Sequence, residues 1–198
     1  RRQRQMCIRD RSNTPRIGGG EKVLLDIIEN LPRSRFIPIV ILPNSEGRLK
    51  EELQRRNIKF GVVKDYFSYA KRYFFLFVFQ VIKYMLWIIK EKIDLIHING
   101  LRGYRAINIA GWITRRKIIC HLHSLPNRAD ILYTFLWRRP NCILCCCENI
   151  RENIMWLRQY KKAKGVVIKS LVNAVDEKKF YALQRGEIEK IKINLGLN

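Results

Sequence analysis

Two pairs of polar residues that could contact a substrate stand near the ends of apolar, strand-like runs. His97 and Asn99 are two residues apart in one run, and His121 and His123 are two apart in a later one. Side chains two apart on a strand share a face, and open α/β sheets bind ligands outside the carboxyl ends of their strands. We therefore predict that His123, the last residue of its strand, faces such a crevice, whereas His121 is buried. A hydrogen-bonded structural role is the alternative for any single histidine.

Three consecutive glycines, Gly18, Gly19 and Gly20, open a predicted helix. Free backbone N–H groups at a helix N-terminus suit a phosphate or another anion. The loop is not a P-loop, because no Gly-Lys-Ser/Thr follows, and residues 21–23 lack the glycine that a dinucleotide-binding G-x-G-x-x-G pattern needs. A flexible loop without a ligand is the alternative interpretation.

The cysteines do not form a recognisable metal site. Cys142 and Cys145 have the C-x-x-C spacing of half a zinc site, but no second pair follows them. Neighbouring cysteines on a strand also point to opposite faces. We predict no metal ion, and we interpret the cysteines as small apolar residues of a buried strand in a reducing compartment.

Alternating strands and helices position these residues. Strands that are apolar nearly throughout, separated by helices, indicate a parallel sheet covered on both faces. We predict a doubly wound, Rossmann-like α/β domain over residues 13–172. Helices are expected from Gly18 to about Leu31 and at residues 45–56, 101–114 and 148–158, and strands at residues 36–42, 58–63, 93–99, 117–122, 141–147 and 166–171.

Residues 1–12 are predicted to lie outside this fold as a non-native or disordered basic tail. They hold five arginines and one aspartate without helical or strand periodicity, and residues 6–10 resemble a translated sequencing-adapter scar. A genuine basic arm is the alternative. The strand that normally precedes a glycine-rich loop in such a sheet is therefore predicted to be missing.

The net charge of +22 over 198 residues favours an anionic partner. The basic residues are scattered over every segment and form no nucleic-acid recognition motif, so we do not expect nucleic acid as the partner. The aromatic, basic segment at residues 66–92 is interrupted by Lys83 and has no apolar stretch long enough to span a membrane. It is either a core helix or a helix with a lipid-facing stripe, whose members would be Tyr73, Phe77, Tyr84 and Trp87.

Six short motifs, in order, resemble the N-terminal domain of family-4-type glycosyltransferases of the GT-B fold. The resemblance covers residues 17–198. Its motifs are the glycine-rich segment 18–26, Leu-Pro and Gly-Arg-Leu within residues 42–49, Asp-Leu-Ile-His-Ile-Asn-Gly at 94–100, His-Leu-His-Ser at 121–124, the segment 147–153, and Asn-Ala-Val-Asp followed by Phe within 173–180.

The resemblance implies transfer of a sugar from a nucleotide-sugar donor to a glycan or lipid-linked acceptor, with retention at the anomeric carbon. Residues 13–172 would bind acceptor, and residues 173–198 would be an interdomain hinge and the truncated start of a donor-binding domain. We expect the chain alone to be inactive, with no cofactor, and the whole enzyme to work in the cytoplasm at the inner face of the membrane. The alternative is a stand-alone basic α/β module that binds nucleic acid or an anionic membrane without catalysis.

Site residues follow from the same resemblance. His123 would be catalytic, by hydrogen-bonding the donor sugar or by stabilising charge as an oxocarbenium-like transition state forms. Asn99 stands where the family pattern has a second histidine. The substrate-binding residues would be Gly18, Gly19, Gly20, Asn99, Ser124, Glu148 and Asn173.

Overall fold

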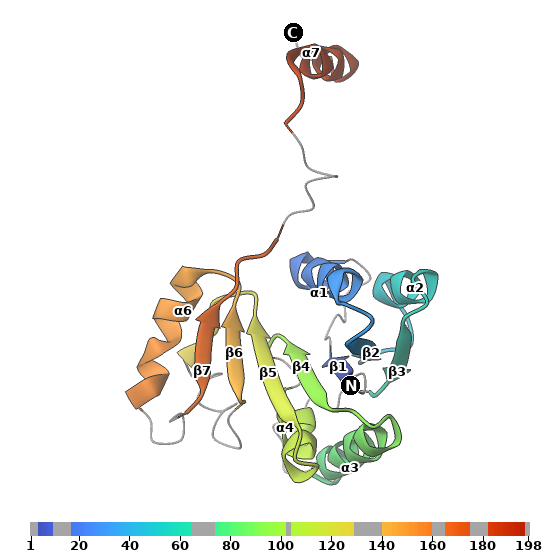
Figure 1. Ribbon diagram of the computed structural model, residues 1–198, viewed down its shortest axis with the longest axis vertical. Coiled ribbons are helices and arrows are strands. Elements are labelled where there is room, and N and C mark those ends of the chain that lie inside the picture. Colours follow the sequence, from blue (N-terminus) through green and yellow to red (C-terminus); the bar gives the residue numbers. More distant parts are fainter. Residues whose placement is uncertain are drawn as a thin grey trace.

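One parallel sheet organises the chain. The computed structural model describes residues 4–9, 17–64, 74–101, 104–128, 140–159, 165–174 and 182–196. Within these residues seven strands pair in the order β3-β2-β1-β4-β5-β6-β7, and every pair is parallel. Helices cover both faces of the sheet (Figure 1). The predicted doubly wound, Rossmann-like α/β class is confirmed.

The predicted strands and helices are confirmed, β2 and β5 with the predicted ends and most of the others with shorter ends. The strands are β1 (Arg4–Arg9), β2 (Phe36–Leu42), β3 (Lys59–Val62), β4 (Leu95–Asn99), β5 (Lys117–Leu122), β6 (Cys142–Cys145) and β7 (Val167–Ser170). The helices are α1 (Gly19–Asn30), α2 (Arg48–Arg55), α3 (Phe74–Lys90), α4 (Tyr104–Ile113), α6 (Glu148–Ile154), the 3₁₀ helix η2 (Met155–Gln159) and α7 (Arg185–Asn194).

The prediction that the first strand is missing was wrong. Residues Arg4–Arg9 form β1, which pairs with β2 on one side and β4 on the other. Met6, Cys7 and Ile8 are buried. A central parallel strand is covered on both faces, so a run of three apolar residues is enough to form its core and no alternation is required. Residues 1–3 and 10–12 lie outside the described part of the chain.

The two faces of the sheet have separate hydrophobic cores. One core joins α3, α4 and α6 to the sheet through residues such as Ile96, Ile98 and Cys120. The other joins α1 and α2 to the sheet through Ile8, Leu24 and other apolar residues. Side chains alternate along a strand, so His97, Asn99, His121 and His123 point to the α1 side.

Three of the residues predicted to form a lipid-facing stripe, Phe77, Tyr84 and Trp87, face the core of the protein instead. Tyr84 is fully buried, and Phe77 and Trp87 are partly buried and pack against the core. These side chains share the helical spacing of the buried Val81 and Ile88, which places them on the inner face of α3. A Cβ atom at Gly61 of β3 would lie 3.0 Å from Trp87 Nε1. Tyr73 lies outside the described residues.

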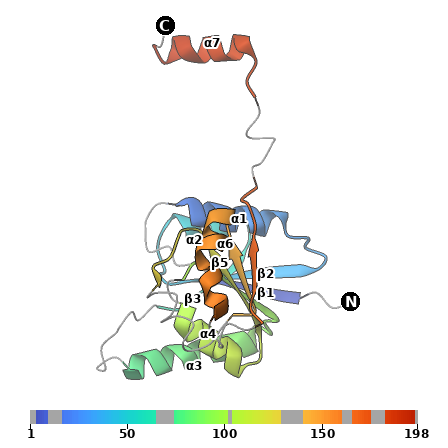
Figure 2. The same ribbon diagram turned by 90° about the vertical axis from the view of Figure 1, so that its left-hand side faces the viewer.

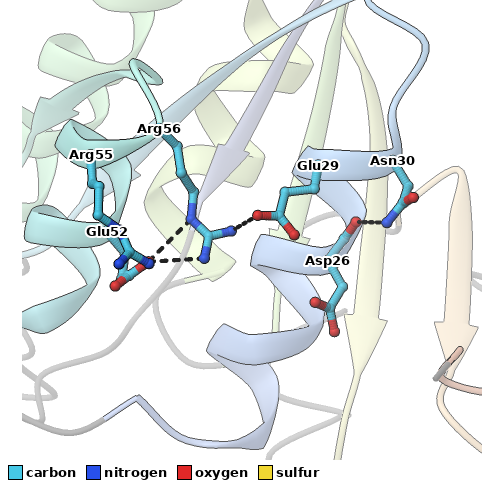
Figure 3. A network of polar contacts seen from close by, with 6 residues as sticks. All are labelled: Asp26, Glu29, Asn30, Glu52, Arg55 and Arg56. Carbon is cyan, nitrogen blue, oxygen red and sulfur yellow. Dashed lines mark hydrogen bonds and ion pairs between the residues drawn. The ribbon is translucent and has the colours of Figure 1, made fainter. Parts of the chain in front are cut away.

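An ion-pair network holds α1 beside α2. Arg56, which follows α2, binds Glu52 through Nη2 at 2.9 Å and also contacts Glu29 of α1 (Figure 3). Exposed pairs of this kind contribute only about 0–1 kcal/mol each. The position of α1, whose N-terminus carries the glycine loop, depends mainly on the packing of Leu24, Leu25 and Ile28 in the core.

Candidate active site

The candidate site lies where the strand order reverses. β1 stands between β2 and β4 in the sheet, and ligands of doubly wound sheets bind outside the carboxyl ends of the strands at such a switch point. Three parts of the chain meet there: the Gly18–Gly20 loop at the start of α1, Asn99 at the end of β4, and His123 just beyond β5.

Asn99 joins the other two parts. Its side chain is 7% exposed, and its Nδ2 group donates to the carbonyl oxygen of Gly20 at 3.1 Å. Its Oδ1 atom lies 2.5 Å from His123 Nε2. Because Oδ1 can only accept, Nε2 carries the proton and donates. The two hydrogen bonds therefore fix both the glycine loop and the tautomer of His123.

His123 is neutral in this environment. Burial lowers the pKa of its imidazole below the ordinary value, and the nearby carboxylate of Glu21 opposes this shift. Its Nδ1 atom is buried and has no hydrogen-bond partner among the described residues. Because Nε2 is already bonded to Asn99, a ligand group has to replace Asn99 in order to bind this nitrogen.

The two other histidines, His97 and His121, are buried next to His123. His97 and His121 are 2% and 1% exposed, which confirms that His121 is buried. The three rings form a row, with centroids 5.5 Å apart between His97 and His121 and 4.2 Å apart between His121 and His123. Burial, and then repulsion from the neighbouring histidines, lowers the pKa of His97 to about 3 and that of His121 to about 4. The row therefore carries no charge near neutral pH.

Glu21 already occupies the N-terminus of α1. Its Oε2 atom accepts from the backbone N–H of Gly18 at 2.9 Å, which is the glutamate half of a capping box. The G-x-x-E spacing is the signal that could have revealed this role. An anion that binds the first N–H group has to displace the carboxylate. A Cβ atom at Gly19 would meet nothing within 4 Å, whereas one at Gly20 would lie 3.4 Å from His123 Cδ2.

The remaining predicted site residues lie along the same edge of the sheet. Ser124 follows His123 and is exposed, and Asn173 is exposed beyond β7. Glu148 begins α6 and pairs with Arg151, whose hydrogen bond, followed by one from Ser170, lowers the pKa of the Glu148 carboxyl. The contacts that join Gly20, Asn99 and His123 do not include these three residues.

A cysteine thiol contacts the backbone of His123. Cys146, just beyond β6, donates its thiol to the carbonyl oxygen of His123 at 3.5 Å. All six cysteines are free thiols. Within the described ranges, no group of three or more His, Cys, Asp and Glu side chains is arranged to hold a metal ion.

Known proteins share both the sequence pattern and the fold. The sequence profile of Glycosyltransferase Family 4 matches residues 17–175. A comparison with curated protein sequences gives no match.

Among solved structures, Anabaena Alr3699/HepE in complex with UDP and glucose superposes with a TM-score of 0.70 at 22% identity, over 96% of this chain and 50% of that one. A glycosyltransferase from Rickettsia africae superposes with a TM-score of 0.74 at 15% identity, over 99% and 50%. For Acinetobacter baumannii MurG the TM-score is 0.58 at 10% identity, over 90% and 70%. The chain thus spans about half the length of the first two structures.

Proposed function

Because the chain belongs to glycosyltransferase family 4 and corresponds to the N-terminal domain of a GT-B fold, we propose that the whole protein transfers a sugar from a nucleotide-sugar donor to a glycan or lipid-linked acceptor. We also propose that the configuration at the anomeric carbon is retained. The Anabaena structure contains UDP and glucose, which supports a UDP-type donor for this protein.

The observation that carries the proposal is the contact of Asn99 with both Gly20 and His123 at the switch point. It brings the glycine loop and the histidine together from sequence positions far apart. The glycine loop lets a substrate approach the backbone closely, and the histidine offers a hydrogen bond at the same place.

We assign His123 a role in orienting the donor sugar through Nε2–H. Positive charge develops at the anomeric carbon in an oxocarbenium-like transition state, and a cationic histidine nearby would oppose it. Burial keeps the pKa of His123 low, so the neutral ring can donate a hydrogen bond without this repulsion. Asn99 acts as a positioning residue that holds the ring until a sugar hydroxyl replaces it.

We propose that a second domain binds the nucleotide, and the length of the matched structures, about twice that of this chain, supports the presence of such a domain. Residues 13–172 would bind the acceptor, with Gly18, Gly19, Gly20, Ser124 and Glu148 along the crevice, and Asn173 would contact substrate from the start of the hinge. Residues 173–198 would lead into the donor-binding domain. The 198-residue chain by itself would then be inactive.

A transfer assay on the protein expressed from its complete reading frame tests this function. We expect turnover of at least one UDP-sugar, and a decrease of kcat by about a hundredfold or more in His123→Ala. Lys117→Gln, an exposed change at the amino end of β5, is the matched control and should keep the activity. Absence of turnover with every nucleotide sugar would contradict the function, and turnover by the 198-residue chain would contradict the division between domains.

We further propose that the enzyme works at the inner face of the membrane. A lipid-linked acceptor would be found there, and a net charge of +22 favours association with anionic lipid. Among the helices that the structure describes, none is long and apolar enough to cross a bilayer. We propose that association uses a surface of the folded domain.

A further inference from the structure

We propose that the outer stripe of α3 docks the protein onto an anionic bilayer. This inference rests on the proposed membrane location but does not depend on sugar transfer. The outer stripe consists of apolar side chains at alternating spacings of four and three residues, which place them on one side of the helix. Its members are Phe75, Phe79, Ile82, Leu86 and Ile89.

α3 is apolar on both of its sides. Val81, Tyr84 and Ile88 are buried against the sheet, whereas Phe75 is 83% exposed and Leu86 is 63% exposed. A helix that is apolar all round is normally covered on every side. Soluble domains rarely leave a contiguous apolar surface in water, and such surfaces mark interaction sites. The outer stripe is therefore a surface that a partner covers.

The neighbouring helix extends this exposed apolar surface. α4 packs beside α3, as both views show (Figure 1 and Figure 2). Trp112 and Ile113, at the end of α4, are 50% and 45% exposed. Tryptophan is favoured at the membrane–water interface, because its ring is apolar and its N–H group can remain hydrated.

The charges around the outer stripe identify the partner as anionic. α3 contains no acidic residue, and its two cations are Lys83 and Lys90. The Lys83 Nζ atom lies 4.6 Å from the centre of the Phe79 ring, within the stripe itself. The first acidic residue beyond the helix, Glu91, is paired with Lys59 at 2.5 Å. Cations therefore stand next to the apolar side chains with no acidic group on the helix to balance them.

An anionic bilayer satisfies both requirements. The apolar side chains can enter the boundary between headgroups and acyl chains, while Lys83 extends along its methylene stem toward the phosphates. A second copy of the chain fits poorly, because it also carries a net charge of +22 and would bring like charges together. With Lys83 near its middle, α3 lies in the plane of the interface.

Co-sedimentation of the 198-residue chain with lipid vesicles tests the proposal. Vesicles of phosphatidylcholine with phosphatidylglycerol are compared with vesicles of phosphatidylcholine alone, without any sugar substrate. We expect binding to the mixed vesicles that weakens as salt is added. Leu86→Ser should weaken binding roughly tenfold by removing apolar burial, and Lys83→Gln should weaken it roughly fivefold.

Two exposed residues away from α3 provide matched controls. Leu125→Ser changes a leucine that is 57% exposed, and Arg48→Gln removes a cation on α2, which covers the opposite face of the sheet. Both variants should bind vesicles like the unchanged chain. Circular dichroism and thermal melting verify that each variant is folded before binding is compared.

Three outcomes would overturn the proposal. One is equal binding to both kinds of vesicle, or binding to neither. Another is that Leu86→Ser and Leu125→Ser weaken vesicle binding equally. The third is a dimer in solution that Leu86→Ser dissociates, since this would make a second copy the partner. The vesicle experiment contains no sugar, so its result does not depend on whether the protein is a transferase. The transfer assay with a soluble acceptor, in turn, does not depend on membrane binding.

Discussion

At the scale of single residues, Asn99 is the side chain on which the candidate site depends. It binds the carbonyl oxygen of Gly20 and the Nε2 atom of His123 at once. An aspartate of the same size cannot donate to Gly20, and its charge favours a protonated imidazole. The amide is therefore the group that can hold both the loop and a neutral histidine.

The pKa of His123 should respond in opposite directions to two changes of charge. Asn99→Asp places a carboxylate at the ring and should raise the pKa. Glu21→Gln removes the one nearby charge that raises it and should lower the pKa further. Proton NMR titration of the His123 ring measures both shifts, with Asn30→Asp on the exposed end of α1 as the control. A shift in the same direction for both variants would contradict the arrangement.

The buried histidines should make stability fall with acid before the carboxylates titrate. The pKa values of His97 and His121, about 3 and about 4, lie below the ordinary 6.5, so the unfolded chain binds protons more readily. Above pH 6.5 the two histidines are neutral in both states and do not lower the free energy of unfolding. Below this it should decrease by up to about 1.4 kcal/mol per pH unit for each histidine.

Urea unfolding between pH 7 and pH 5 measures this loss. His97→Gln replaces one titrating ring by a neutral side chain, so the decrease should become shallower. The pKa values of Glu52 and Glu148 lie below 4.5, so these carboxyls contribute little in this window. An unchanged slope in His97→Gln would show that His97 is accessible to protons in the folded state.

At the scale of elements, the sequence predicted most strands because each is a short apolar run between polar turns. The residues 117–122 form β5 as predicted. β1 was not predicted, because its apolar run is only three residues long, from Met6 to Ile8, and is flanked by arginines. The orientation of α3 was missed for a different reason. On a helix with apolar residues on every side, periodicity does not distinguish the buried face, and only packing against the sheet does.

Close packing between α4 and the sheet should make Gly111 intolerant of a side chain. A Cβ atom there would lie 2.7 Å from Ile96 Cδ1 and 3.0 Å from Ile118 Cδ1. Gly111→Ala therefore forces the Ile96 and Ile118 side chains or α4 itself to shift, and should lower the free energy of unfolding by about 1–3 kcal/mol. Gly19→Ala, where the added Cβ meets nothing within 4 Å, should change it by less than about 0.5 kcal/mol. Chemical denaturation compares the two, and equal effects would refute the packing argument.

At the scale of the whole molecule, the topology explains why part of the candidate site could be predicted from the sequence. Parallel strands bring their carboxyl ends to one edge, so Asn99, His123 and the glycine loop could be placed together from the sequence. The thiol contact of Cys146 depends on loop geometry that no spacing of residues determines, whereas the G-x-x-E spacing could have revealed the capping role of Glu21. Glu148 binds Arg151, an i,i+3 neighbour on α6, and its predicted contact with substrate stays a prediction.

The chain beyond β7 should contribute nothing to the stability of the sheet domain. α7 buries none of its residues and lies apart from the sheet in both views (Figure 1 and Figure 2). Among the residues that the structure describes, neither core includes one after Ile168. Truncation after Ala174 should therefore change the free energy of unfolding by less than about 0.5 kcal/mol in urea.

The matched control for that truncation removes β7 as well. Ile168 is buried, and Leu171 donates its backbone N–H to Cys145 at 2.7 Å, so a chain that ends at residue 164 should lose more than about 2 kcal/mol. A similar loss from both truncations would mean that α7 docks onto the domain in solution. Loss from the shorter chain alone would place the boundary of the folding unit between β7 and Ala174, where the proposed hinge begins, and the exposed apolar side chains of α7 would then be available to a second domain.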